Sequence, residues 1–298
     1  MQSCKVPQFW EAELKFIGMK KLKKILAFVV AVLMAVVYFA DEINGVVDNV
    51  QEVLPVQFDL SNVGMPVLQN GASSQVIVYT GHTLSYNSAT RLPNWVAYEL
   101  TAQEAQGENP RKDKFARDSQ VRGPQADKED YRNSGWDRGH MAPAGDMKWS
   151  TQAMDETYYF TNICPQNHEL NAGDWKELEE QCRRWAIKYG SLHVVCGPVI
   201  EKNSHGKIGA NKVVVPDKFY KVILIPKGGQ YHGVGFIFQN PPKRKSKIST
   251  KPAVQRPLQS YAVSIDEVER IAGIDFFPSL PEQLQQHIES NSSLPSGK

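Results

Sequence analysis

The stretch from Gly135 to Arg184 constrains the fold and the chemistry of this chain more than any other. It contains the run Asp137–His140 between glycine- and proline-containing turns, then the segment Asn162–Gln166, then a charged segment from Trp175 onward. Glycine and proline interrupt regular structure, so the histidine and the asparagines are expected on loops or at the ends of elements. Polar groups presented in this way by a packed scaffold are typical of reactive sites. We therefore predict that the flanking strands and helices form a scaffold for this stretch.

Composition sets the broad class of protein. The chain has 298 residues, 41% of them hydrophobic and 22% charged, which allows one large domain or two small ones with a sizeable core. The net charge of +2 gives no overall preference for polyanions, so a phosphate site must come from local basic residues. Four cysteines without CxxC or Cys/His spacing predict neither a disulfide-rich scaffold nor a zinc site, and they leave the disulfide pairing open.

The N-terminal segment, residues 19–40, predicts export. An uncharged run, Ile25–Ala40, follows four lysines between positions 20 and 24, and Asp41 and Glu42 restore polarity. This order is typical of a signal peptide or a short membrane anchor, and both readings stay open beside that of a buried core helix. If the segment starts at Met19, residues 1–18 are an upstream extension. We predict a periplasmic or secreted protein, or one anchored to the outer side of the inner membrane.

The rest of the chain predicts a single α+β domain. Strands are expected at 75–79, 81–86, 95–100, 192–197, 213–216, 219–225 and 234–238. Ser264 and Glu267 form a capping box at the start of a helix that ends near Ala272. Strands before and after a mixed centre favour a largely antiparallel central sheet flanked by helices. The domain is placed at residues 73–282, after a lead-in at 41–72 and before a polar tail at 283–298.

A long polar loop, residues 103–134, leads into the central stretch. Its basic residues include Arg111, Lys112, Lys114, Arg117, Arg122 and Arg132. Long loops in compact domains are usually functional, although a solvated surface of mixed charge has the same composition. Because this loop precedes His140, it is a reasonable place for phosphate contacts.

His140 is the candidate general base. An imidazole titrates near neutral pH, and the glycine before His140 allows the backbone to approach a ligand or a strand closely. A single histidine is more often a surface or core residue, and the other six lie in strand-like or polar surroundings that favour this interpretation. His140 differs because Asp137 and Arg138 lie within three residues of it.

Asparagines and a helix complete the candidate site. Amide oxygens of Asn162, Asn167 or Asn171 suit a hard cation such as Mg²⁺, although turn-forming or capping roles are common for asparagine. Apolar residues from Trp175 onward recur with helical spacing, and Glu179 and Arg183 form an i,i+4 pair that is usually a surface ion pair. Asn171 lies eight residues before Glu179, so about two turns of one helix can bring both to one site.

These motifs together resemble the DNA/RNA non-specific endonuclease family, whose members are ββα-metal nucleases. The resemblance rests on Asp137–His140, on Asn162–Gln166, and on Asn171 with Glu179 and Arg183, and it extends over residues 75–280. The set is far more specific than the Asp-Arg-Gly-His run alone. Cys164 departs from the Ser or Thr that is common at its position in the family.

The resemblance implies a role for each site residue. His140 is implied to be the general base and Asn171 the direct ligand of Mg²⁺, with Mn²⁺ or another divalent cation as alternatives. Glu179 is implied to hold the waters of the metal, and Arg183 to contact the phosphate. The remaining implied contacts come from Arg138 and Asn162, which position the phosphate and the histidine segment, and from an upstream arginine, Arg117 before Arg111.

The predicted function is therefore metal-dependent hydrolysis of phosphodiester bonds in DNA and RNA, with 5′-phosphate products. No base-reading element is visible, so recognition through the phosphate backbone is expected. Two other functions stay open: a phosphodiesterase for small substrates, and a catalytically idle nucleic-acid-binding envelope protein on the same fold. The sequence leaves the oligomeric state and the preference between DNA and RNA open.

Overall fold

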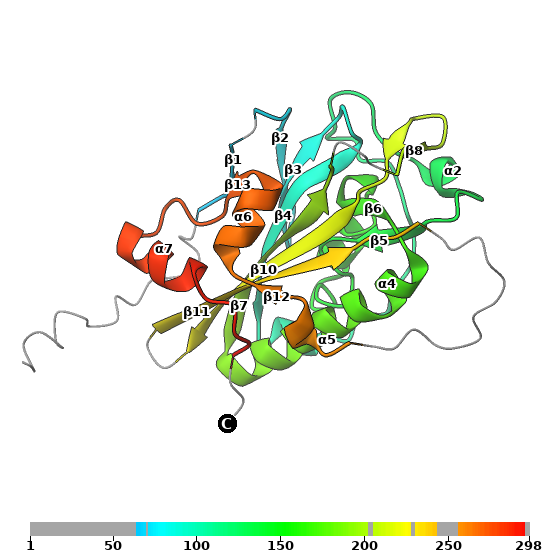
Figure 1. Cartoon of the computed structure of the whole chain (residues 1–298). Coiled ribbons are helices and arrows are strands. Elements are labelled where there is room, and N and C mark those ends of the chain that lie inside the picture. Colours follow the sequence, from blue (N-terminus) through cyan, green and yellow to red (C-terminus); the bar gives the residue numbers. More distant parts are fainter. Residues whose placement is uncertain (1–63, 70, 202–204, 228–229, 243–255, 296–298) are drawn as a thin grey trace, which may run out of the picture. The chain divides into compact units, whose positions relative to one another are not determined.

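A seven-stranded antiparallel sheet is the centre of the computed structural model (Figure 1). Across the sheet the strands are β12 (Ala262–Val263), β11 (Gln230–Gln239), β10 (Lys218–Lys227), β7 (Ser191–Val199), β4 (Leu92–Thr101), β3 (Thr83–Asn87) and β2 (Gln75–Val78). Every neighbouring pair is antiparallel. The predicted α+β fold with a largely antiparallel sheet is confirmed.

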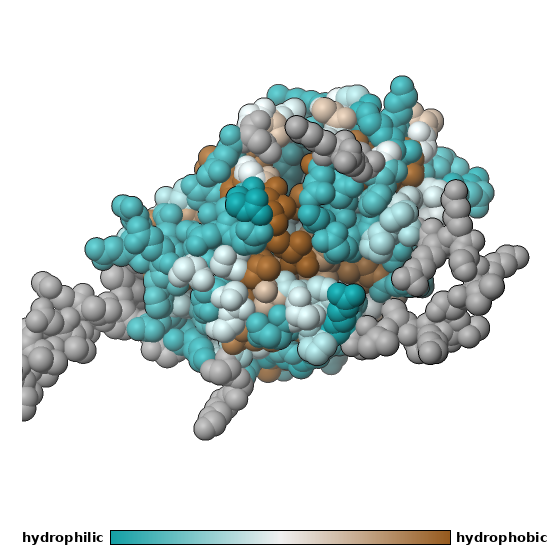
Figure 2. Space-filling model, viewed as in Figure 1, coloured by the Kyte–Doolittle hydropathy of each residue, from teal (hydrophilic) through white to brown (hydrophobic). Residues whose placement is uncertain are grey.

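The structure describes residues 64–69, 71–201, 205–227, 230–242 and 256–295, which all belong to one unit, Gln57–Lys298. The predicted signal peptide or anchor at 19–40 and most of the lead-in at 41–72 lie outside the described residues. Within the described ranges, none of the helices has the length and apolar character needed to cross a bilayer. Hydrophilic residues cover most of the face in Figure 2, with a smaller hydrophobic area among them.

Alternating residues of the sheet face two different layers of helices. Along β10, Phe219 and Ile223 pack with α5 (Asp174–Tyr189), whereas Tyr220 and Val222 pack with α6 (Ile265–Ala272) and α7 (Glu282–Glu289). Side chains of a strand point alternately to its two faces, so this period of two assigns each helix to one side of the sheet. The predicted apolar face of α5 is buried: Trp175, Leu178, Cys182, Trp185 and Ala186.

A second, smaller group of elements lies beside the sheet. The Asp137–His140 run forms strand β5, which pairs antiparallel with β6 (Ile163–Gln166). Two further strand pairs are β1 (Val67–Leu68) with β13 (Ile274–Asp275), and β8 (Lys207–Ile208) with β9 (Val213–Val214). The short helices are η2 (Glu104–Gln106), α2 (Lys128–Tyr131), α3 (Thr151–Glu156), η3 (Phe160–Asn162), α4 (His168–Ala172) and η4 (Leu258–Ser260).

Three details differ from the sequence predictions. The strand expected at 213–216 is the short β9, which lies outside the central sheet. The loop at 103–134 contains a helical turn, α2, whose N-terminus is closed by a capping box of Asp127 and Asp130. The folded unit also extends past both predicted ends, because β1 precedes residue 73 and α7 lies in the predicted polar tail, where Ile288 is buried. Cys164, Cys182 and Cys196 are buried free thiols.

Candidate active site

A cavity of about 780 Å³ opens where β5, α4 and α5 meet the long loop. Six of the eight residues singled out from the sequence line it: Arg111, Arg138, His140, Asn171, Glu179 and Arg183. Its other charged lining residues are Asp113, Lys128, Glu129, Arg132, Asp137 and Lys176. Lysine and arginine outnumber acidic residues on its wall by six to four, so the cavity is suited to an anion. Asn162 and Arg117 do not line it.

The position of His140 is fixed by its strand. His140 lies opposite Ile163 in the β5–β6 ladder, and its carbonyl accepts a hydrogen bond of 3.3 Å from the indole Nε1 of Trp175 on α5. A Cβ at position 139 would overlap the side chain of Gln166, so only glycine allows the two strands to pack at this point. The Gly139–His140 pair therefore joins strand and helix at the edge of the cavity.

The imidazole of His140 lies in an aromatic pocket. Its ring centroid is 5.4 Å from that of Phe115 and 4.9 Å from that of Tyr158, which meets it edge-on. Its Nε2 is buried and has no hydrogen-bond partner among the described residues. Burial, with a smaller contribution from Arg111, lowers the pKa of His140 to about 3. The ring is therefore neutral at physiological pH, as a proton acceptor must be.

Asn162 supports the segment that follows His140. It is completely buried, and its Oδ1 accepts a 2.9 Å hydrogen bond from the Ala142 N–H. Its Nδ2 donates to the carbonyls of Ala142 and Thr157, both at 2.9 Å. The backbone thus engages both ends of this buried amide, which suits it to positioning the histidine segment and keeps it off the cavity wall.

The side-chain amide of Asn171 is held at its nitrogen. Its Nδ2 donates a 3.0 Å hydrogen bond to Oδ2 of Asp137, which also contacts Nδ1 of His168 at 2.8 Å. Since the amide nitrogen is held, the carbonyl oxygen of Asn171 is the atom available to the cavity. Asn171 and Glu179 line the same cavity, and an amide oxygen with a carboxylate is a donor set of the kind that hard divalent cations take, so the residues present fit such an ion.

Asn171 and Glu179 lie on two helices, not on one as expected. Helix α4 ends at Ala172 and α5 begins at Asp174, with Gly173 between them at φ −111° and ψ −110°. A Cβ at Gly173 would overlap the carbonyl of Glu169, so this break requires glycine. Asn171 and the pair Glu179–Arg183 therefore reach the cavity from separate elements.

Glu179 has an unusual electrostatic environment. Burial raises the pKa of its carboxyl to about 7, and the ammonium of Lys221 is the strongest opposing influence. Lys221 lies on β10, is completely buried, and its Nζ has no hydrogen-bond partner among the described residues. The sequence did not single out Lys221, because a lysine within a strand gives no sign of facing a site.

Arg183 is held by another residue that the sequence analysis did not assign. Its Nη1 donates a 2.6 Å hydrogen bond to Oδ1 of Asp146, which is completely buried. The second oxygen of Asp146 accepts a 2.9 Å hydrogen bond from the hydroxyl of Tyr98 on β4. The guanidinium is therefore fixed at the cavity, with its remaining N–H groups available for an anion.

The candidate arginines differ in their position relative to the cavity. Arg111 lines the cavity and is held by Tyr158, whose hydroxyl accepts from Nε at 3.0 Å, and by Asp113 at 3.3 Å. Arg138 lies with its guanidinium carbon 4.2 Å from the ring centroid of Phe115. Arg117, which the sequence favoured over Arg111, is exposed and away from the cavity wall. Of these two arginines, Arg111 therefore lies on the cavity wall and Arg117 does not.

This geometry agrees with the comparisons to known proteins. A family model described as DNA/RNA non-specific endonuclease matches residues 61–283. The chain belongs to this family. Among similar proteins, mitochondrial nuclease EXOG of Danio rerio is 40% identical over 75% of this chain and 66% of its own length. Human mitochondrial endonuclease G is 32% identical over 74% of each chain.

A solved structure supports the same fold. A chain in the crystal structure of the EndoG/EndoGI complex matches with a TM-score of 0.64 and 30% identity, over 74% of this chain and 91% of that chain. The resemblance to the non-specific endonucleases and the predicted ββα-metal nuclease fold are therefore confirmed. The chain spans only 58–66% of the length of the EXOG relatives.

The predicted export is wrong. This member of the non-specific endonuclease family is similar to nucleases named as mitochondrial in animals and yeast, which does not support a periplasmic or secreted location. A basic cluster followed by an apolar run is shared by several kinds of targeting segment, so the N-terminal composition alone did not separate export from other destinations. The family is one of divalent-metal-dependent nucleases, which the oxygen donors of the cavity fit.

Proposed function

We propose that this chain is a divalent-metal-dependent endonuclease that hydrolyses phosphodiester bonds of DNA and RNA. One observation carries the proposal: a neutral histidine, an asparagine, the carboxylate of Glu179 and four arginines line one cavity. Hydrolysis of a phosphodiester needs a proton acceptor for water and positive charge near the developing phosphoryl oxygens. The cavity provides both within a wall that favours anions.

His140 is proposed as the general base. Its neutral ring takes a proton from a water molecule, whose oxygen then forms a bond to phosphorus while the bond to the 3′ oxygen breaks. The 3′ oxygen leaves as a hydroxyl after taking a proton from solvent. The product keeps the phosphate on its 5′ end. Arg183, held by Asp146, and Arg111, held by Tyr158 and Asp113, would donate hydrogen bonds to the phosphate oxygens.

The metal site is proposed at Asn171 and Glu179. The amide oxygen of Asn171 would bind the cation directly, and the carboxylate of Glu179 would accept hydrogen bonds from its waters. A bound Mg²⁺ supplies Lewis-acid stabilisation of negative charge on phosphate oxygens. Mg²⁺ keeps most of its waters and needs few protein ligands, which agrees with this small donor set; Mn²⁺ has similar oxygen preferences.

A cleavage assay tests the proposal directly. Purified full-length protein is incubated with supercoiled plasmid or an RNA transcript, with Mg²⁺ or with EDTA. We expect both substrates to be cut only with metal, and His140→Ala to lose at least about 10²-fold in rate through loss of the base. His287→Ala, an exposed histidine on α7, is the matched control and should cut as well as wild type. Intact plasmid and RNA in the wild-type reaction with Mg²⁺ would refute the proposal.

The same assay separates the alternatives. A phosphodiesterase for small substrates would cleave bis(p-nitrophenyl) phosphate but leave plasmid intact. An idle binding protein would retard nucleic acid in a gel without cutting it. Ligation of the cleavage products without prior kinase treatment tests the 5′-phosphate ends, because ligase requires that group.

We also propose a mitochondrial location, supported by the names of the relatives. Residues 1–63 fused to a fluorescent protein should direct it to mitochondria in cultured animal cells. A fusion in which the lysines at positions 20, 21, 23 and 24 are replaced by glutamine should lose this location. A diffuse or secreted wild-type fusion would contradict the proposal.

A further inference from the structure

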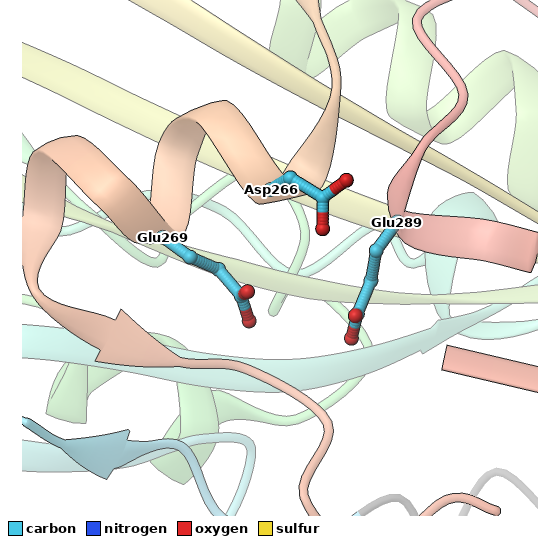
Figure 3. A group of neighbouring side chains, drawn as sticks. All are labelled: Asp266, Glu269 and Glu289. Atoms are coloured by element: carbon cyan, nitrogen blue, oxygen red, sulfur yellow. The ribbon is translucent and has the colours of Figure 1, made fainter. Parts of the chain in front are cut away.

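Three carboxylates converge between α6 and α7, on the side of the sheet away from the active-site cavity. Asp266 and Glu269 come from α6, and Glu289 is the last residue of α7 (Figure 3). One oxygen from each lies within 4.8 Å of the others. The cavity layer is formed by α5, whereas α6 and α7 pack with Tyr220, Val222 and Leu224 on the opposite face of β10. This cluster is therefore separate from the proposed catalytic site.

Glu289 is the residue that requires an explanation. Its side chain points toward the other two carboxylates (Figure 3), and the residue is only 7% exposed. Its Oε1 is buried and has no hydrogen-bond partner in the part of the chain that the structure describes. A buried carboxylate oxygen without a partner is costly unless a proton or a cation neutralises it.

The surroundings of Glu289 increase this cost. A negative charge in the last turn of a helix faces the negative end of the helix dipole. Burial, followed by the carboxylates of Glu269, Asp266 and Asp275, raises the pKa of Glu289 to about 7. The nearest arginine on α6, Arg270, is already bound to Glu267 at 2.7 Å. Three other carboxylates thus surround Glu289, and the side chain of Arg270 is directed elsewhere.

We propose that Asp266, Glu269 and Glu289 form a binding site for a structural Ca²⁺ ion. Calcium bonds to carboxylate oxygens at about 2.3–2.6 Å, so oxygens up to about twice that distance apart can share one ion. The observed limit of 4.8 Å agrees with this span. Ca²⁺ accepts irregular geometry and completes its shell with water, which the exposed Asp266 side of the cluster allows.

The site would join the end of α7 to the start of α6. Glu269 is itself held by the backbone N–H of Phe276, which donates to its Oε1 at 2.9 Å. The backbone carbonyl of Ile288, the residue before Glu289, packs closely against β11. A Cβ at Gly233 on this strand would overlap the Ile288 carbonyl oxygen. A bound ion would therefore tie both helices to the sheet and stabilise the folded state without taking part in cleavage.

Calorimetric titration and thermal unfolding of the chelator-treated full-length chain test this. Both are carried out in an Asn171→Ala background, so that the proposed catalytic metal site does not contribute. We expect one bound Ca²⁺ and a rise in Tm of about 3 °C at ten times the Kd, with a smaller effect of Mg²⁺. Glu289→Gln should abolish the binding and the Ca²⁺-induced rise in Tm. Glu282→Gln, an exposed change on the same helix, should keep both.

The quantity to compare is the rise in Tm caused by Ca²⁺ in each variant, here called the increment. The Tm without Ca²⁺ is not compared, because Glu289→Gln can raise it by removing a buried charge. If Glu289→Gln does not fold, Asp266→Asn at the exposed side of the cluster gives the same test. Absence of Ca²⁺ binding, or an equal increment in the background protein and in both cluster variants, would overturn the proposal. The variants Glu289→Gln and Asp266→Asn without the Asn171→Ala change are then assayed for plasmid cleavage. Loss of the Ca²⁺-induced rise in Tm with intact cleavage would separate this site from the nuclease function.

Discussion

The ammonium of Lys221 lies 4.4 Å from the centre of the Trp175 ring, inside the layer between the sheet and α5. A cation over an indole face is stabilised by the ring quadrupole, which partly replaces the water that burial removes. Lys221 also opposes the rise in the pKa of Glu179 and of Asp146. We infer that it is a positioning residue: it keeps carboxylates beneath the cavity ionised without touching substrate.

Replacing Lys221 by methionine should therefore move the pH profile of cleavage. Loss of the cation removes the main influence that lowers the pKa of Glu179, so the acid limb of kcat/KM should shift upward by about 1 pH unit. Lys188→Met, at the exposed end of α5, is the matched control and should leave the profile unchanged. An acid limb at the wild-type pH in Lys221→Met, with the fold intact by circular dichroism, would contradict this role.

The wild-type enzyme should lose activity as the pH falls through about 7 when metal is limiting. The folded pKa of Glu179 is raised, so its charge is present above that value and is lost below it. His140, with a pKa of about 3, stays neutral across this range and does not contribute. A bound cation favours the charged carboxylate, so saturating Mg²⁺ should move the midpoint to lower pH. A midpoint of activity near pH 6.5 that does not change with metal concentration would instead indicate titration of His140.

Asp137 should control metal affinity through Asn171. Asp137→Asn weakens the hydrogen bond that fixes the Asn171 amide, and such supporting contacts are typically worth about 10–100-fold in metal affinity. We expect the Mg²⁺ concentration for half-maximal cleavage to rise by that factor, while the rate at saturating Mg²⁺ falls less. His168→Ala removes the other partner of the same carboxylate, and as an exposed residue it should have little effect. Equal Mg²⁺ dependence in Asp137→Asn and wild type would contradict the coupling.

The two loop arginines offer a paired test of substrate contact. Arg111→Ala should reduce kcat/KM for plasmid by about 10–100-fold, the range for one charge-assisted phosphate contact. Arg117→Ala, an equal loss of charge six residues later, should stay within about two-fold because it is outside the cavity and exposed charges act weakly. The opposite result would place the substrate on a different part of the loop.

Acid should also destabilise the fold through buried neutral histidines. The two ring nitrogens of His193 are buried without a partner among the described residues, and burial lowers the pKa of the ring to about 4. Its unfolded pKa is higher, so the unfolded chain binds the extra proton and stability is lost as the pH falls below about 6.5. Between pH 7 and 5 one such histidine accounts for about 2 kcal/mol of unfolding free energy. His193→Leu should reduce the loss of unfolding free energy between pH 7 and 5, measured by urea unfolding, by that amount. An equal loss in the variant and the wild type would contradict this role of His193.

The sequence was informative where chemistry and spacing are local. Arg138, His140, Asn171, Glu179 and Arg183 were identified together from the sequence, and in the structure all five line one cavity, together with Asp137. Strands β4, β7, β10 and β11 were predicted near their observed positions because their β-branched and aromatic runs are long.

The missing parts depend on contacts distant in sequence. Asp146 and Arg183 are 37 residues apart in the sequence, and Lys221 lies on β10, which packs against α5. The choice of Arg111 over Arg117 depends on how Tyr158 and Asp113 hold the loop, which no local pattern encodes. The break at Gly173 was missed because a single glycine within a helical pattern does not by itself end a helix, and only the close approach of its backbone to Glu169 explains the break.

The alternation of β10 has a consequence for folding. Tyr220 and Lys221 are neighbours in the chain but face opposite layers of the molecule. A slip of β10 by one residue against its partner strands would turn the ammonium toward the apolar layer beneath α6 and the phenol toward the cavity. The charge that supports Glu179 therefore also disfavours mispaired registers. An insertion of one residue before Lys221 should consequently impair assembly of the sheet and nuclease activity together.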